Sequence, residues 1–229
     1  EFRSINFVDQ HRGFAVGQNT SLAFPNGATI ARSTDGGDNW NVQEIDSVAF
    51  LSSVYFVNTA TGWAVGGTYP GNQEVITKTT DSGSTWVFQS RGKVFTNLLS
   101  VRFADASNGW AVGNYGVILK TTNSGSQWIR QATPSGFNAP LFSVFCSSPQ
   151  RCWTSSWGTI LFTSDSGTTW SYQQSPSSSA PLSSMHFVNQ NTGWAVGGGT
   201  ILKTTTGGIV SVAEQYSRER EAPPVFKLE

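Results

Sequence analysis

A five-residue sequence recurs along this chain and constrains its fold more than any other feature. Gly-Phe-Ala-Val-Gly at residues 13–17 returns as Gly-Trp-Ala-Val-Gly at 62–66, 109–113 and 193–197. The same register laid over residues 141–156 reveals a further, divergent copy, so that five copies follow one another every 41–49 residues. A period of this length indicates one small supersecondary unit, whose copies must stack against each other to bury their apolar faces.

Four of the five copies contain an aromatic residue six positions before the first glycine of the repeated sequence. The residues between them read as the end of an alternating strand, a short polar turn and the start of a second strand. We therefore expect an aromatic ring to cover a bare glycine across each hairpin. The four pairs are Phe7 and Gly13, Phe56 and Gly62, Phe103 and Gly109, and Phe187 and Gly193.

The only two cysteines occupy these two positions in the divergent copy, with Cys146 in place of the phenylalanine and Cys152 in place of the glycine. Opposed residues of an antiparallel pair have Cβ atoms about 4.5–5.5 Å apart, close to disulfide reach. We expect a structural disulfide, with two free buried thiols as the alternative. A disulfide predicts an extracytoplasmic protein, whether secreted, periplasmic or on the cell surface.

The sequence gives little support for a metal site or a redox site. The chain has two histidines, His11 and His186, which fall in different repeats, and the cysteines lack the C-x-x-C spacing of redox pairs. We expect no metal and no cofactor.

A second signature, S/T-x-D-x-G-x-x-W, follows the third expected strand of each copy. It occurs at residues 33–40, 79–86, 121–128 and 163–170, and in degenerate form at 204–211. The acidic or amide side chain should accept hydrogen bonds from the backbone of its own turn, while the glycine adopts a left-handed conformation and the tryptophan packs back into the core. These side chains, expected to be structural, are Asp35, Asp81, Asn123 and Asp165.

Four short strands per unit, five units and no convincing helix predict an all-β fold, a five-bladed β-propeller of four-stranded antiparallel blades. A solenoid of stacked sheets is the structural alternative. The last copy includes an expected fourth strand at residues 209–213, and residues 214–229 read as a charged tail or linker. The expected propeller covers residues 1–213, with blades at about 2–44, 45–90, 91–132, 133–174 and 175–213.

Composition removes several classes of function. Charged residues make up 12% of the chain, and no cluster of basic residues occurs before Arg218, so we expect no nucleic-acid partner. No apolar run approaches the roughly 20 residues that span a bilayer, and we expect no membrane span. The hydrophobic content of 38% is enough for a full core, and we expect a monomer.

The S/T-x-D-x-G-x-x-W turns resemble the Asp-box (BNR) repeats of sialidases and related propellers. The units that couple GWAVG to such a turn are similar to the Ycf48-like photosystem II assembly and stability factors, over about 200 residues. The second resemblance implies a propeller that engages protein partners. The first implies a possible glycoside hydrolase of the sialidase or xyloglucanase kind.

Glycoside hydrolysis generally needs two carboxylates on either side of the scissile bond. Of the propeller carboxylates, Asp38, Glu44, Asp46 and Glu74 lie outside the turn positions. The candidates for such a pair are Glu44, Asp46 and Glu74. This enzyme is our alternative hypothesis. The first hypothesis is a non-enzymatic binding or scaffold module.

In a four-stranded blade, the turns after the first and third strands lie on one face of the ring. The turns after the second strand and the connections between blades lie on the opposite face, where this sequence varies most. Aromatic rings among Asn, Ser and Gly suit the recognition of a glycan or protein partner, although some could simply plug the mouth of the channel. The candidates on this face are Phe24, Tyr69, Phe95, Tyr115, Phe137 and Trp157.

Overall fold

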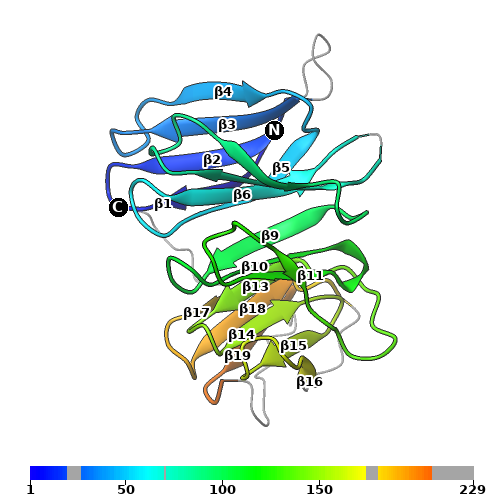
Figure 1. Cartoon of the computed structure of the whole chain (residues 1–229). Helices are drawn as coiled ribbons and strands as arrows, with labels where there is room; N and C mark the ends of the chain where they lie inside the picture. Colours follow the sequence, from blue (N-terminus) through cyan, green and yellow to red (C-terminus); the bar gives the residue numbers. More distant parts are fainter. Residues whose placement is uncertain (20–26, 70, 174–179, 208–229) are drawn as a thin grey trace.

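The computed structural model describes residues 1–19, 27–69, 71–173 and 180–207, and these residues form five antiparallel sheets (Figure 1). We call the sheets blades one to five in chain order. The expected strand at 209–213 lies outside the described residues. The strands of the first two blades are β1 (Phe2–Phe7), β2 (Gly13–Asn19), β3 (Gly27–Ser33) and β4 (Asn41–Ile45), then β5 (Phe50–Phe56), β6 (Gly62–Gly67), β7 (Glu74–Thr79) and β8 (Val87–Arg91).

The remaining blades follow the same up-and-down order of neighbouring strands. A single 3₁₀ turn, η1 (Asn114–Gly116), interrupts blade three after its second strand. The strands are β9 (Leu98–Phe103), β10 (Gly109–Gly113), β11 (Ile118–Thr121) and β12 (Ile129–Arg130), then β13 (Ser143–Cys146), β14 (Cys152–Ser155), β15 (Ile160–Thr163) and β16 (Ser171–Gln173), and finally β17 (Ser184–Phe187), β18 (Gly193–Gly197) and β19 (Thr200–Thr204).

The predicted pairing of aromatic ring and glycine is confirmed in four blades. Phe56 lies directly opposite Gly62, and a Cβ built on that glycine would lie 2.6 Å from the ring. The same opposition joins Phe7 to Gly13, Phe103 to Gly109 and Phe187 to Gly193. No side chain larger than hydrogen fits beneath these rings, which explains why glycine begins the second strand in these four blades.

Blade four replaces this pair with a disulfide, as the register predicts. Cys146 and Cys152 are opposite each other on β13 and β14, with their Cα atoms 4.1 Å apart and their sulfur atoms bonded. Both are buried in the cluster that also contains Leu141 and Trp110. The cystine thus fills the place that a ring occupies in the other blades.

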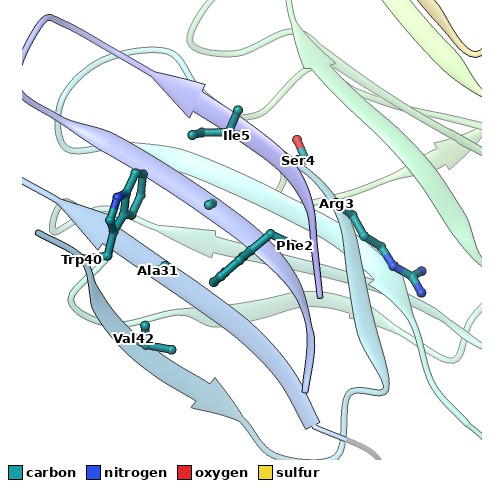
Figure 2. A pocket seen from close by; sticks show the side chains of 8 residues that line it. Phe2, Arg3, Ser4, Ile5, Ala31, Trp40 and Val42 are labelled. Carbon is teal, nitrogen blue, oxygen red and sulfur yellow. The ribbon is translucent and has the colours of Figure 1, made fainter. Parts of the chain in front are cut away.

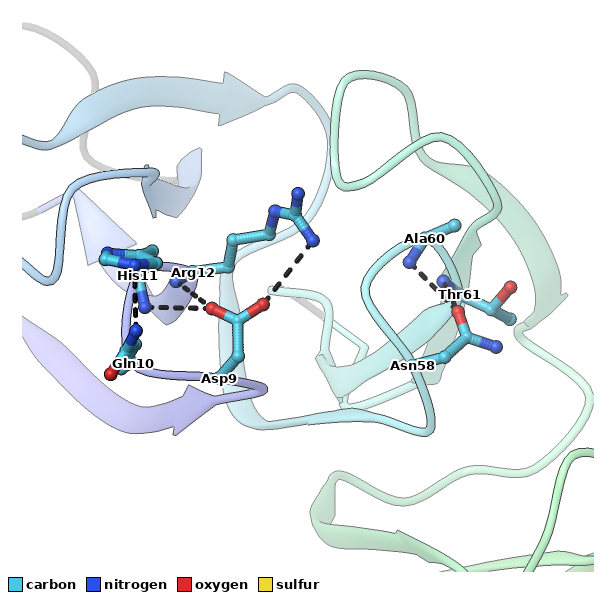
Figure 3. A network of polar contacts seen from close by, with 7 residues as sticks. All are labelled: Asp9, Gln10, His11, Arg12, Asn58, Ala60 and Thr61. Carbon is cyan, nitrogen blue, oxygen red and sulfur yellow. Dashed lines mark hydrogen bonds and ion pairs between the residues drawn. The ribbon is translucent and has the colours of Figure 1, made fainter.

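The turn between the first two strands of a blade is held by one side-chain oxygen. Asp9 Oδ1 accepts hydrogen bonds of 2.8 Å from the backbone N–H groups of both His11 and Arg12, and Asn58 Oδ1 does the same for Ala60 and Thr61 (Figure 3). Aspartate and asparagine stabilise tight turns in this way because their oxygens reach the backbone two and three residues ahead. Asp105 and Asn189 repeat the arrangement in blades three and five.

The Asp-box turns also have the predicted geometry. In blade two, Asp81 Oδ1 accepts a 2.9 Å bond from Thr85 N–H, and Thr79 Oγ accepts one from Gly83 N–H. Gly83 has a φ of +78°, in the left-handed region that favours glycine. The hydrogen bond from the Thr85 hydroxyl, followed by that from its backbone, lowers the pKa of Asp81 to about 2. Asn123 accepts the equivalent backbone bond from Gln127 in blade three.

The core lies between consecutive blades. Between blades one and two, Phe14, Val16 and Ile30 on the far side of blade one pack against Val54 and Phe56 on the near side of blade two. Equivalent clusters join blades two and three, three and four, and four and five. Trp63, Trp110 and Trp153, which stand where blade one has Phe14, are completely buried. Of the Asp-box tryptophans, which the sequence predicts to be core residues, Trp170 is buried and Trp40, Trp86 and Trp128 are half-buried.

Candidate functional site

The two ends of each blade differ, as the sequence predicts. At one end the Asp-box turn contacts the first hairpin turn of its own blade, through bonds such as Ser82 N–H to Ala60 O (2.9 Å) and Ser124 N–H to Ser107 O (3.0 Å). At the other end the turn after the second strand contacts the connections between blades. The uniform, structural turns are therefore separated from the variable loops.

The variable loops form a continuous series from blade two to blade five. Asn114 N–H donates to Asn97 O at 3.1 Å, and Gly116 N–H donates to Ala139 O at 2.9 Å. The Ser156 hydroxyl donates to Pro140 O, and Gly158 N–H donates to Ala180 O at 2.8 Å. The turns after the second strand in blades three and four are thus each tied to the blade connections on both sides of them.

Glu74 holds the first of these loops together. Its side chain is completely buried, and its Oε1 accepts hydrogen bonds from the Ser90 hydroxyl (2.8 Å) and Lys93 N–H (2.9 Å). Its Oε2 accepts one from Val94 N–H (2.8 Å). A buried carboxylate is stable only when such donors surround it. The sequence hypothesis placed Glu74 in a catalytic pair, whereas the structure surrounds it with the groups that shape the loop at 91–97.

Two aromatic rings extend from the loops of blade two. Tyr69 is 70% exposed and Phe95 is 75% exposed, the highest values among the large hydrophobic side chains that the structure describes. Phe95 follows the segment held by Glu74, and Thr96 beside it is fully buried, with its hydroxyl donating to Asn114 O at 3.0 Å. A rigid backbone therefore presents the exposed Phe95 ring.

Tyr115 sits on the turn of blade three in a left-handed conformation, with a φ of +57°, and is 56% exposed. Phe137 lies differently, because its half-buried ring packs against the core between blades three and four. A Cβ on Gly116 would lie 2.9 Å from that ring, and Tyr172 contacts it edge-on at a centroid distance of 6.1 Å. Phe137 therefore supports the loop rather than projecting from it.

Trp157 is partly exposed and partly packed against a neighbouring side chain. Its ring is 49% exposed, while one edge contacts Phe142 at a centroid distance of 5.6 Å, and its backbone forms an isolated bridge with Pro181. The sequence offered two environments for this ring, contact with a neighbouring loop or availability to a ligand. The structure shows a loop contact that leaves half of the ring open. We call Tyr69, Phe95, Tyr115 and Trp157 the variable-loop face.

The remaining candidates from the sequence, Glu44, Asp46 and Phe24, are not part of this face as the structure describes it. Glu44 is exposed on the outer strand β4, where Asn19 Nδ2 donates to its Oε1 at 2.5 Å, and Asp46 follows the same strand, also exposed. Phe24 lies outside the described residues. No group of three or more His, Cys, Asp or Glu side chains among residues 1–19, 27–69, 71–173 and 180–207 could hold a metal ion. In the same residues, no helix is long and apolar enough to cross a membrane.

Comparison with known proteins agrees with this architecture. Three solved structures illustrate the likeness. An ancestral GH74 enzyme is 14% identical and matches 94% of this chain and 31% of its own, with a TM-score of 0.70. The WD40 β-propeller domain of Doa1 is 14% identical, with 95% and 69% covered and a TM-score of 0.66. YCF48 bound to D1 peptide is 22% identical, with 94% and 82% covered and a TM-score of 0.49.

The fold is thus the all-β fold of the β-propellers. Four of the antiparallel sheets have four strands and the fifth has three in the described residues, so five sheets fit five blades. Residues 33–135 match the family model of the photosynthesis system II assembly factor YCF48. These residues accordingly carry Ycf48-like repeats of the Asp-box type, which confirms the resemblance inferred from the sequence. A search of curated proteins finds no match.

Proposed function

We propose that this chain, with its five propeller blades, is a non-enzymatic, extracytoplasmic module that binds a protein partner through the variable-loop face. The observation that carries the proposal is the set of four exposed aromatic rings on loops that internal hydrogen bonds hold in place. Such rings supply large contact areas at low conformational cost, and they dominate protein interfaces energetically. The Ycf48-like repeats support a protein partner, because the matched family consists of assembly factors.

The disulfide supports the extracytoplasmic location, because such bonds persist in oxidising compartments. The hydrolase alternative has weaker support. Glu74 is buried beneath its loop, and Glu44 and Asp46 lie on the outer edge of blade one. The likeness to a GH74 enzyme, at 14% identity, concerns the fold.

Panning a library of random linear peptides against the full chain tests the proposal, with the D1 peptide as an added probe. We expect Trp157→Ala to weaken the selected peptides by about 30-fold, the effect of losing a 2 kcal/mol aromatic hot spot. Thermal melting should stay nearly unchanged, because the ring is half exposed.

Ile129→Ala is the matched control, since this side chain is 55% exposed on the outer strand β12 and directly follows the Asp box of blade three. It should leave peptide affinity unchanged. A glycan array forms a second arm of the experiment. Recovery of glycans without peptides, or of peptides insensitive to both Trp157→Ala and Tyr115→Ala, would contradict a protein-binding face at these residues.

A further inference from the structure

Three of the four interfaces between consecutive blades use the same pair of rings, and Trp110 meets the cystine at the interface between blades three and four. In the three, a ring on the second strand of one blade stacks on the ring that covers the glycine of the next blade. Phe14 stacks on Phe56 with centroids 3.7 Å apart, Trp63 on Phe103 at 3.6 Å, and Trp153 on Phe187 at 4.3 Å. In each case the stacked rings belong to consecutive blades.

A hydroxyl on the first strand adds a hydrogen bond to each of these interfaces. The Ser4 hydroxyl accepts a bond from Val54 N–H of blade two at 3.3 Å. Ser53, Ser100 and Ser143 accept equivalent bonds from the next blade, from Val101, Val144 and Met185 at 3.2–3.3 Å. The serine therefore recurs at this position of the repeat because it accepts a backbone hydrogen bond from the next blade.

A lysine on the third strand completes two of the interfaces. Lys78 Nζ donates to Ser124 O at 2.9 Å, and Lys120 Nζ donates to Ser166 O at 2.6 Å. Both accepting carbonyls belong to the Asp box of the following blade. Each ammonium group also lies over the tryptophan of its own blade, at 5.1 and 5.3 Å from the ring centroid.

Blade one presents the half of this interface that receives the ring of a preceding blade, and no ring of the described residues stacks on its Phe7 from that side. Phe7 meets Trp40 edge-on at 6.0 Å, as Phe56 meets Trp86 at 5.9 Å in blade two. Phe7 is nevertheless 42% exposed and Ile5 59% exposed, while their counterparts Phe56 and Val54 are 4% exposed. Figure 2 shows Ile5, Trp40 and Val42 around the resulting hollow, whose volume is about 550 Å³.

Blade five presents the other half of this interface, the face that packs on a following blade, and no described blade packs against it. Val196 is 39% exposed and Ile201 48% exposed, whereas Val65 and Ile76, which occupy the same positions in blade two, are completely buried. Ser184 and Lys203 stand at the positions of the interface serine and lysine, and both are exposed. Figure 1 shows blade one (blue) and blade five (orange) at opposite ends of the molecule.

We propose that blade five of one molecule docks onto blade one of a second copy and reproduces the interface seen between consecutive blades. Trp194 then stacks on Phe7, the Ser184 hydroxyl accepts from Ile5 N–H, and Lys203 donates to Gly36 O. Both halves of the interface are present on this chain, and they match position by position. Exposed apolar surfaces of this kind mark association sites.

The two faces differ from each other, so the contact is heterologous, and copies join end to end unless the rotation between them closes a ring. The sequence alone predicted a monomer, because the exposure of the two end faces becomes visible only in the folded chain. The proposed contact uses surfaces other than the variable-loop face, so either proposal can fail without the other.

Two variants separate the halves of the interface: Ile5→Asp disables blade one, and Ile201→Asp disables blade five. Both side chains are exposed, so both variants should fold as the parent does. Sedimentation velocity over a range of concentrations should show the parent associating and each variant monomeric. An equimolar mixture of the two variants should form a dimer and nothing larger, because each copy retains one working face.

Val188→Asp is the control, since Val188 is 62% exposed in a turn of blade five outside the face. It should associate like the parent. A parent that stays monomeric at every concentration overturns the proposal, and if both variants also melt earlier, the two faces meet within one molecule instead. Association that persists in both variants assigns the contact to another surface and equally overturns it.

Discussion

At the position that begins each second strand, the type of residue that fits depends on the residue directly opposite on the first strand. Four blades place a ring over glycine there, and blade four places a cystine. Because the two solutions occupy the same pair of facing positions, they should be interchangeable. A ring over glycine removes apolar surface from water, while the cystine restricts the unfolded chain.

We therefore predict that Cys146→Ser with Cys152→Ser lowers the free energy of unfolding by about 2 kcal/mol, the chain-entropy term for a short loop. Cys146→Phe with Cys152→Gly should recover much of this loss, because it installs the pair found in the other blades. Denaturant unfolding with and without reductant measures both effects. The parent should be sensitive to reductant and the Phe–Gly variant insensitive, and equal sensitivity would contradict the prediction.

The Asp boxes make stability depend on pH. Hydrogen bonds to the carboxylates, from Asn39, Thr85 and Thr169 first, lower the pKa values of Asp35, Asp81 and Asp165 to about 2. The ordinary value is 3.8, so the folded state favours the ionised form. The stabilisation is complete above the ordinary pKa and disappears as the pH falls from about 4 towards 2.

Asp81→Asn tests this dependence, because Asn123 already supplies an amide at the equivalent position. At pH 6 the variant should melt below the parent, since the carboxylate also accepts from the Thr85 hydroxyl. The difference in melting temperature should shrink as the pH approaches 2, where the parent's carboxylate becomes protonated. A difference that stays constant from pH 6 to pH 2 would show that ionisation of Asp81 contributes nothing.

At the scale of elements, the connection between blades two and three depends on a single buried side chain. Glu74 ends the loop that carries Tyr69 and accepts hydrogen bonds from the segment that leads to Phe95. The shape of both loops thus depends on one carboxylate. Stability and binding should consequently be coupled in this part of the molecule.

We predict that Glu74→Gln costs about 1–3 kcal/mol, because the amide has one acceptor oxygen and leaves a buried donor without a partner. Glu44→Gln, on an exposed side chain, should change stability by less than about 0.5 kcal/mol. Chemical denaturation of the two variants compares them directly. Equal stability of the Glu74 variant and the parent would mean that the loop adjusts to supply another acceptor.

At the scale of the whole molecule, each blade is covered by its neighbours. The contacts of blade three extend to blades two and four, whereas blades one and five each leave one face in water. Structures built from nearest-neighbour units lose their ends first, because an end unit has half of the interfaces.

Hydrogen exchange followed by mass spectrometry should show this gradient in the Ile5→Asp protein at low concentration. Peptides from β9 and β10 should exchange more slowly than those from β1 and β17, since opening the middle disrupts two interfaces. In the associating parent, protection of β1 should increase. Equal protection of all five sheets would indicate a single cooperative unit without weak ends.

The sequence by itself determined the features that lie within one repeat. These features are the register of the hairpins, the ring over glycine, the disulfide and the Asp-box turns. Each depends on residues a few positions apart, and the five copies make the pattern recognisable. The same is true of the tryptophan that follows each Asp box. The all-β fold follows from these features because every copy reads as short strands joined by tight turns.

Only the tertiary structure decided what depends on contacts between repeats. Glu74 reads as a free carboxylate in sequence, and its burial appears only when the segment at 91–97 folds over it. Trp157 gains its contact with Phe142 and Phe137 gains its place in the core through packing that no local pattern encodes. The uncovered faces of blades one and five belong to the same category, because whether a face is covered depends on the placement of another blade.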